Sequence, residues 1–108
     1  FGEVALLMNN AGTAGGGHPW QNREAWQKVL GVNLWGVLYG LQVSVPGMLA
    51  QGPPCAIVNT GSKQGLTNPP GDAAYNASKA AIKSLTEGLA RELRSLEGCR
   101  VSAHLLIP

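Results

Sequence analysis

The chain has 108 residues, of which 44% are hydrophobic and 13% are charged, and it carries a formal net charge of +2. This composition is typical of a soluble globular protein, and the length allows one domain that is too small to bury its surface generously. The charges are scattered, so no basic patch indicates binding to nucleic acid or to acidic lipid. No apolar run approaches the length needed to span a bilayer and nothing resembles a secretory signal, so we expect a cytoplasmic protein.

Three short apolar segments are predicted to form β-strands. The first runs from Val4 to Met8, the second covers residues 56–60, and the third covers residues 101–107. Unbroken apolar runs of this length are typical of strands that are buried on both faces of a parallel sheet.

Two long helices are predicted between these strands. Residues 24–50 carry apolar side chains at helical spacing, interrupted by the polar Asn33, and Gly52 with two prolines ends the helix. The second helix starts after Asp72, a suitable N-cap, and ends before Gly98. Its apolar stripe consists of Ile82, Leu85, Leu89, Leu93 and Leu96.

The order strand, helix, strand, helix, strand predicts an α/β architecture. Consecutive right-handed crossovers place three parallel strands side by side with both helices on the same face. A parallel sheet is normally covered on both faces. We therefore expect elements outside residues 1–108 to cover the other face.

Tyr75 and Lys79 are four residues apart in the second predicted helix, so their side chains lie one turn apart on the same side. This spacing occurs often by chance, and both could be solvated side chains. However, helical periodicity places them on the side of Ile82, Leu89 and Leu93, which is predicted to face the core. Lys79 also lies in the early turns, where the helix dipole disfavours a cation. A chemical role explains this, because an ammonium favours a phenolate and the pair can exchange a proton with a substrate oxygen.

Ser62 and Asn33 are the other candidates for chemistry. Ser62 follows the second strand, at the end where open α/β sheets bind ligands. Its hydroxyl could bind a reacting carbonyl, or it could be a turn serine after Gly61. An asparagine in a helix usually faces water. Val32 and Leu34 on either side of Asn33 instead suggest a partly buried position that needs hydrogen-bond partners.

Four separated motifs occur in one order along the chain. They are Asn9-Asn10-Ala11-Gly12, Val32-Asn33-Leu34, Ile57-Val58-Asn59-Thr60-Gly61-Ser62 and Tyr75-Asn76-Ala77-Ser78-Lys79. Each is modest alone, and Asn9 or Asn10 could simply cap a strand end. Their joint order and spacing resemble the short-chain dehydrogenase/reductase family, and the Asn-Asn-Ala-Gly form resembles its short single-domain branch.

This resemblance implies an oxidoreductase that moves a hydride between NAD or NADP and a secondary alcohol or ketone. Tyr75 would be the general acid in reduction and the base in oxidation, and Ser62 would hold the substrate oxygen. Lys79 would assist Tyr75 and bind the nicotinamide ribose, while Asn33 would help to position Lys79 through an ordered water. The cofactor-binding residues implied are Asn10, Ala11, Gly12, Thr60, Tyr75, Lys79 and Pro108.

The resemblance also implies a Rossmann-type doubly wound fold, of which residues 1–108 form a partial NAD(P)-binding domain. The family's first βαβ units, with their glycine-rich pyrophosphate turn, and its substrate-loop region have no counterpart here. Gly15-Gly16-Gly17 is no substitute, because it follows a different strand.

The partners implied are a small alcohol or carbonyl substrate and a second copy of the chain, with a homodimer or homotetramer formed through the two long helices. The alternative is a truncated or degenerate relative that acts as a non-catalytic structural or interaction module. No metal site is expected, because His18, His104, Cys55 and Cys99 lie apart and no carboxylate cluster accompanies them.

Overall fold

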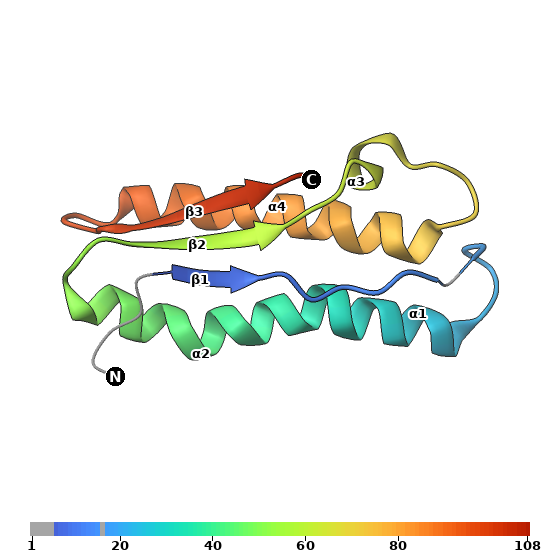
Figure 1. Cartoon of the computed structure of the whole chain (residues 1–108), viewed down its shortest axis with the longest axis horizontal. Helices are drawn as coiled ribbons and strands as arrows, with labels where there is room; N and C mark the ends of the chain where they lie inside the picture. Colours follow the sequence, from blue (N-terminus) through green and yellow to red (C-terminus); the bar gives the residue numbers. More distant parts are fainter. Residues whose placement is uncertain (1–5, 16) are drawn as a thin grey trace.

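A parallel β-sheet forms one layer of the computed structural model, which describes residues 6–15 and 17–108 (Figure 1). Its three strands, in spatial order, are β1 (Leu6–Asn9), β2 (Cys55–Thr60) and β3 (Val101–Leu106). Strand β2 pairs in parallel with both neighbours, as predicted. Val4, Ala5 and Gly16, which belong to the predicted first strand and glycine loop, lie outside the described residues.

Two long helical segments connect the strands, as the sequence predicts. The first comprises α1 (Arg23–Leu30), a π-helical turn η1 (Gly31–Trp35) and α2 (Gly36–Gln51). The second is α4 (Ala73–Ser95), which is preceded by a short helix α3 (Gln64–Thr67) that was not predicted within the Gly- and Pro-rich loop. Asp72 occupies the N-cap position of α4, but its side chain makes no capping hydrogen bond.

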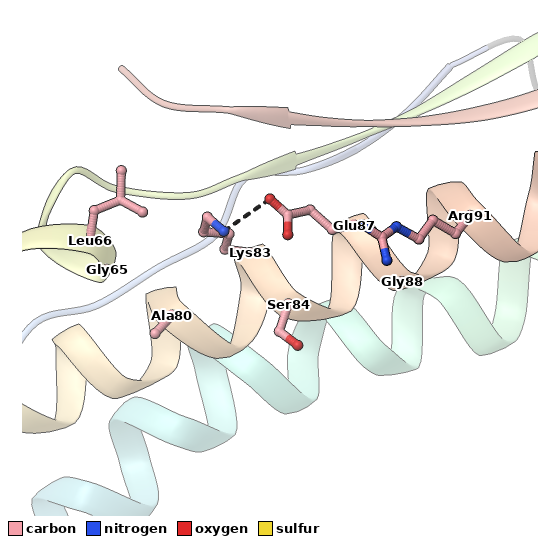
Figure 2. A pocket seen from close by; sticks show the side chains of 8 residues that line it. All are labelled: Gly65, Leu66, Ala80, Lys83, Ser84, Glu87, Gly88 and Arg91. Atoms are coloured by element: carbon pink, nitrogen blue, oxygen red, sulfur yellow. Dashed lines mark ion pairs between the residues drawn. The ribbon is translucent and has the colours of Figure 1, made fainter.

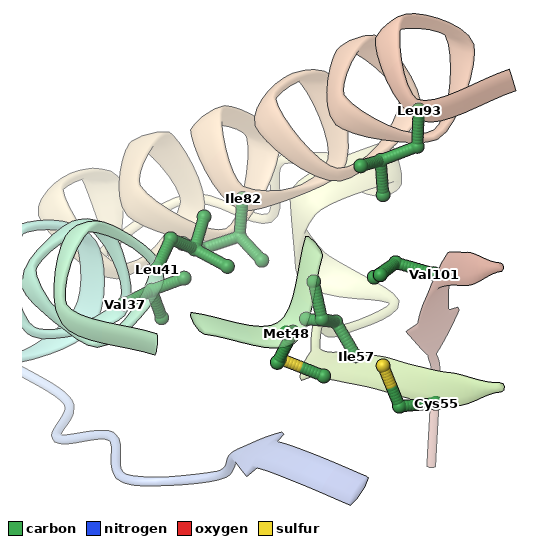
Figure 3. Packing of buried hydrophobic residues seen from close by; sticks show 8 residues of the cluster. All are labelled: Val37, Leu41, Met48, Cys55, Ile57, Ile82, Leu93 and Val101. Carbon is green, nitrogen blue, oxygen red and sulfur yellow. The ribbon is translucent and has the colours of Figure 1, made fainter. Parts of the chain in front are cut away.

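The core lies between the sheet and the two long helices, which pack on the same face (Figures 1 and 3). Along β2, side chains alternate between buried and half-buried, which is typical of a strand with one face against helices. Burial of each large apolar side chain contributes about 1.5–3 kcal/mol. The core cluster consists of Val37, Leu41, Met48, Cys55, Ile57, Ile82, Leu93 and Val101.

The opposite face of the sheet is open in the described part of the chain. Leu6 and Met8 are 58% and 50% exposed, and the β3 side chains Ser102, His104 and Leu106 are exposed as well. The sheet therefore has one packed face and one open face, and a covering layer from outside residues 1–108 stays a prediction.

The helical stretch Arg23–Gln51 is long and apolar enough to cross a membrane, by length and composition only. The expectation that no segment reaches this length is therefore wrong. Core helices of soluble proteins meet the same criteria, and Val37, Leu41 and Met48 of this stretch are buried. One such helix is weak evidence for a membrane segment.

Candidate functional site

A pocket of about 570 Å³ lies where β1 and β2 end beside the first turns of α4. Parallel strands end at the same edge of a sheet, so the residues that follow β1 and β2 come together there. Two lysines, Lys63 and Lys79, line the pocket, and none of its described lining residues is acidic. The lining residues are Asn10, Gly12, Thr13, Ala14, Thr60, Gly61, Ser62, Lys63, Gln64, Tyr75, Lys79 and Pro108.

Lys79 is the buried cation of this pocket, with an exposed fraction of 5%. Its Nζ donates a hydrogen bond of 3.1 Å to the carbonyl oxygen of Thr60 and lies 5.7 Å from the centroid of the Tyr75 ring. Burial lowers the pKa of Lys79 from its ordinary value, because the charged form loses hydration. An ammonium has three N–H donors, so donors remain for a ligand oxygen.

Ser62 and Tyr75 line the pocket as half-buried residues. Ser62 Oγ accepts a hydrogen bond of 3.2 Å from the backbone N–H of Gln64. Because a hydroxyl has one hydrogen and two lone pairs, this bond leaves the Ser62 hydrogen available to an acceptor in the pocket. Tyr75 carries a phenol that can donate or accept a proton, so two hydroxyls share the pocket with an ammonium.

Asn33 lies behind the pocket, fully buried in the π-helical turn η1. Its Oδ1 accepts from the Thr13 N–H at 2.7 Å, and its Nδ2 donates to the Thr13 carbonyl at 2.9 Å and to Ser78 Oγ at 3.0 Å. These bonds fix the segment at Gly12 and Thr13. A Cβ atom on Gly12 would lie 3.4 Å from Lys79 Nζ, so the segment passes close to the ammonium.

A second set of hydrogen bonds ties the strand ends together. Thr60 Oγ1 donates to Asn10 Oδ1 at 2.8 Å, on the pocket side of the sheet edge. Asn9 Nδ2 donates to Asn59 Oδ1 at 2.8 Å, and Asn59 Nδ2 donates to Thr86 Oγ1 of α4 at 3.0 Å. Asn59 is fully buried, so both of these bonds satisfy polar groups that water does not reach.

A separate hollow of about 590 Å³ lies on the outer side of α4, between this helix and α3 (Figure 2). It holds none of the predicted site residues. Lys83 and Glu87 form an ion pair of 3.0 Å there, and Arg91 lies one turn further along the helix. Within residues 6–15 and 17–108, no three His, Cys, Asp or Glu side chains come together as metal ligands.

The family model of short chain dehydrogenases matches residues 1–106. The chain belongs to the short-chain dehydrogenase family. Its backbone is similar to that of a short-chain dehydrogenase/reductase from Burkholderia phymatum crystallised with NAD, with a TM-score of 0.94 and 48% identity. It is also similar to the closed form of a serine dehydrogenase complexed with NADP+, with a TM-score of 0.87 and 29% identity. The resemblance and the Rossmann-type fold that it implied are thus confirmed.

The relatives of this short-chain dehydrogenase chain are longer than the chain itself. An NAD-dependent oxidoreductase of Mycobacterium tuberculosis, named as uncharacterized, is 40% identical over 104 residues, which are 95% of this chain and 38% of that protein. The match with the Burkholderia phymatum protein covers 100% of this chain and 38% of that protein. The match with the serine dehydrogenase covers 98% of this chain and 42% of that protein. It therefore spans about two fifths of the proteins that it matches.

Most of the predicted site residues converge on the 570 Å³ pocket, namely Asn10, Gly12, Thr60, Ser62, Tyr75, Lys79 and Pro108. Ala11 lines a neighbouring hollow of about 200 Å³ instead, together with Val32. Asn33 was expected to be partly buried, and it is completely buried behind the pocket.

Several residues around the site were not predicted. Thr13 and Lys63 line the pocket because they directly follow the predicted residues Gly12 and Ser62, and Gln64 lines it from the start of α3. Ser78 and Thr86 are buried hydroxyls on the core side of α4. Both fall close to the apolar stripe of the helix, which is a signal that the sequence offered.

Proposed function

We propose that the whole protein is an NAD- or NADP-dependent oxidoreductase that acts on a small secondary alcohol or ketone, with Tyr75 as its general acid and base. The observation that carries this proposal is the convergence of Tyr75, Lys79 and Ser62 on one pocket at the ends of parallel strands. Relatives that are named as NAD-dependent or were crystallised with NAD or NADP+ support the cofactor class.

The chemistry of the pocket fits the nicotinamide ribose of such a cofactor. Lys79 retains N–H donors for ribose hydroxyls after its bond to Thr60. Gly12 has no side chain, so the space beside Lys79 Nζ stays open. Asn10, Ala11, Thr60 and Pro108 would line the rest of the cofactor site. When bound, NAD or NADP supplies or accepts the hydride.

The residues of the chain would manage the proton at the substrate oxygen. Ser62 would donate its free hydrogen to that oxygen and hold it in place. Tyr75 would protonate the oxygen during carbonyl reduction and remove the proton during alcohol oxidation. Lys79, with its Nζ 5.7 Å from the phenol ring centroid, would assist Tyr75 in this step. General acid–base catalysis of this kind contributes about 10²–10⁴-fold to the rate.

Asn33 would act indirectly, through the residues that it holds in place. It holds Thr13 through both backbone polar groups and so keeps Gly12 beside Lys79. An ordered water between the η1 turn and Lys79 would complete a path for protons to solvent. In the proposed assignment, Asn33 therefore positions Lys79 and does not contact substrate.

Residues 1–108 would form the central part of a larger Rossmann-type domain in a cytoplasmic enzyme. The open sheet face and the greater length of the relatives support this view. We also propose a homodimer or homotetramer through the long helices, because Trp35, Tyr39 and Val43 form an exposed apolar stripe at helical spacing.

Titration of the whole protein with NADH and NADPH, followed by nicotinamide fluorescence, tests the proposal. Saturable binding of either cofactor is the expected result. The same stripe of Trp35, Tyr39 and Val43 favours the alternative, a non-catalytic interaction module. Stable oligomers that bind neither cofactor would support the module and contradict the enzyme.

A further inference from the structure

We propose that Ser78 is a positioning residue that fixes Asn33 and, through Asn33, the segment at Gly12 and Thr13 beside Lys79. The inference rests on the proposed function, because this segment lines the proposed cofactor pocket. Ser78 is fully buried, precedes Lys79 on α4, and is not among the residues that line the pocket.

The Ser78 hydroxyl uses both its donor and an acceptor lone pair. Its Oγ donates a hydrogen bond of 2.7 Å to the backbone carbonyl of Tyr75 and accepts one of 3.0 Å from Asn33 Nδ2. A hydroxyl has a single hydrogen. Because the Tyr75 carbonyl accepts that hydrogen, Ser78 Oγ can only accept a hydrogen bond from Asn33. Asn33 must therefore be the donor.

This polarity fixes the orientation of the Asn33 amide. With Nδ2 toward Ser78, the same Nδ2 donates to the Thr13 carbonyl at 2.9 Å and Oδ1 accepts from the Thr13 N–H at 2.7 Å. With the amide reversed, acceptor would face acceptor at Ser78 and at the Thr13 carbonyl, and donor would face donor at the Thr13 N–H. Such mismatches are costly for buried groups, and Asn33 and Ser78 are both fully buried, so the amide has one orientation.

The Asn33 amide in turn sets how closely the glycine segment approaches the ammonium. A Cβ on Gly12 would lie 3.5 Å from Asn33 Oδ1 and 3.4 Å from Lys79 Nζ, so Gly12 lies against both groups. A shift of Asn33 would therefore move Gly12 and Thr13 relative to Lys79. Ser78 thus links the backbone of Tyr75 to the wall of the pocket.

Helix α4 offers a matched control for Ser78. Thr86 has an exposed fraction of 2%, against 0% for Ser78, and lies about two turns further along the helix. Thr86 Oγ1 donates to the Ile82 carbonyl at 2.6 Å and accepts from the amide of a buried asparagine, Asn59, at 3.0 Å. The two hydroxyls therefore have the same kind of partners, and only Ser78 holds the segment beside Lys79.

The test compares Ser78→Ala with Thr86→Val in the whole protein. Both variants lose a buried hydroxyl, so both should lower the midpoint of thermal unfolding. Only Ser78→Ala should raise hydrogen exchange at the Thr13 amide and weaken NADH binding, by about tenfold, measured by fluorescence titration. Ser78→Thr keeps the hydroxyl, so once folded it should retain the wild-type NADH affinity even if its extra methyl group lowers stability.

Unchanged NADH affinity in Ser78→Ala would overturn the inference, and so would an equal loss in Thr86→Val. If Ser78→Ala does not fold, Ser78→Cys takes its place in the test, because its thiol is similar in size and is a weaker acceptor. Weaker NADH binding is then expected of Ser78→Cys. If the wild type binds neither NADH nor NADPH, the proposed function fails. Hydrogen exchange at the Thr13 amide needs no cofactor, so it still decides whether Ser78 holds the segment. If Ser78→Ala does not raise this exchange, the inference is overturned.

Discussion

At the level of single residues, the burial of the charged Lys79 side chain is energetically unfavourable. Lys79 is 5% exposed, and its ammonium has one hydrogen-bond partner among the described residues, the carbonyl of Thr60. Removing a charge from water without an opposite charge costs free energy. Proteins keep such groups where function requires them, and the lowered pKa of Lys79 belongs to the same pocket as Tyr75 and Ser62.

The lowered pKa of Lys79 predicts how stability depends on pH. The unfolded chain holds the Lys79 proton up to about its ordinary value of 10.5, whereas the folded chain releases it at lower pH. The wild type should therefore gain stability as the pH rises from the folded pKa toward 10.5. Lys79→Met lacks this gain, so the free energy of unfolding of the variant minus that of the wild type should fall as the pH rises through this range.

Chemical denaturation of the whole protein at neutral and alkaline pH measures this difference. Lys79→Gln, which is also neutral, should show the same trend as Lys79→Met. If the free energy of unfolding of the variant minus that of the wild type instead rises with pH, the folded state holds the Lys79 proton more tightly than the unfolded chain. That result would contradict the account.

Single residues were predictable from the sequence where a repeating pattern constrained them. Helical periodicity was enough to place Lys79 on the core side of α4, because the surrounding apolar stripe fixes that side. The partners of Asn33 were not predictable. They come from Thr13 and Ser78, which lie 20 and 45 residues away in sequence, and no local pattern specifies such contacts.

At the level of elements, the first helical segment differs from the prediction at the π-helical turn η1. The sequence predicted one continuous helix with a polar interruption, and the structure places Asn33 in a π-helical turn between α1 and α2. Helical spacing alone does not distinguish a π turn from an α turn. The short helix α3 was missed because its four residues carry too little pattern to distinguish them from a loop.

Gly40→Ala is predicted to destabilise the contact between α2 and β1. A Cβ at this position would lie 2.6 Å from Asn9 Oδ1. Asn9 is held by its hydrogen bond to Asn59, so relief of the clash would break that bond and leave buried polar groups unpaired. We expect a loss of about 1–3 kcal/mol in the free energy of unfolding.

Gly47→Ala is the matched control in the same helix. A Cβ there meets nothing within 4 Å, so the better helix propensity of alanine should leave stability unchanged or raise it by up to about 1 kcal/mol. Equal effects of the two substitutions would contradict the close contact at Gly40. Denaturant titration of the whole protein measures both.

At the scale of the whole chain, residues 1–108 are more extended than a compact domain of that length. Its radius of gyration is 15.1 Å, whereas a compact chain of this size has about 13 Å. Its principal-axis extents are 46 × 25 × 21 Å, so the layers of sheet and helices form an elongated unit. The sequence predicted the open face, because three strands and two helices on the same face leave the other face bare.

Residues 1–108 expressed alone are predicted to be poorly stable or to aggregate. Leu6, Met8, Leu106 and Ile107 are each more than 40% exposed, and apolar patches beyond a few hundred Å² promote association. Size-exclusion chromatography and thermal unfolding would check this. A soluble monomer with a cooperative unfolding transition would count against the prediction.

Val43→Glu is predicted to dissociate the proposed oligomer. Val43 is 83% exposed and follows Tyr39 by one helical turn, so the new charge would be buried in an interface between copies. Sedimentation velocity of the whole protein should show a shift to smaller species with unchanged helix content. Gln27→Glu, which adds the same charge at an exposed position of α1, should leave the assembly intact, and an intact oligomer in Val43→Glu would place the interface elsewhere.

The central claim is that Tyr75 moves the proton in an NAD(P)-dependent reaction, and turnover by Tyr75→Phe tests it most directly. The whole protein would be assayed with NAD+ and NADP+ on simple secondary alcohols such as 2-butanol and cyclohexanol, with Tyr39→Phe as the control for loss of a phenol outside the pocket. The account predicts that Tyr75→Phe still binds NADH or NADPH and loses at least about 10²-fold in kcat, while Tyr39→Phe keeps wild-type activity. Undiminished turnover by Tyr75→Phe would contradict the account.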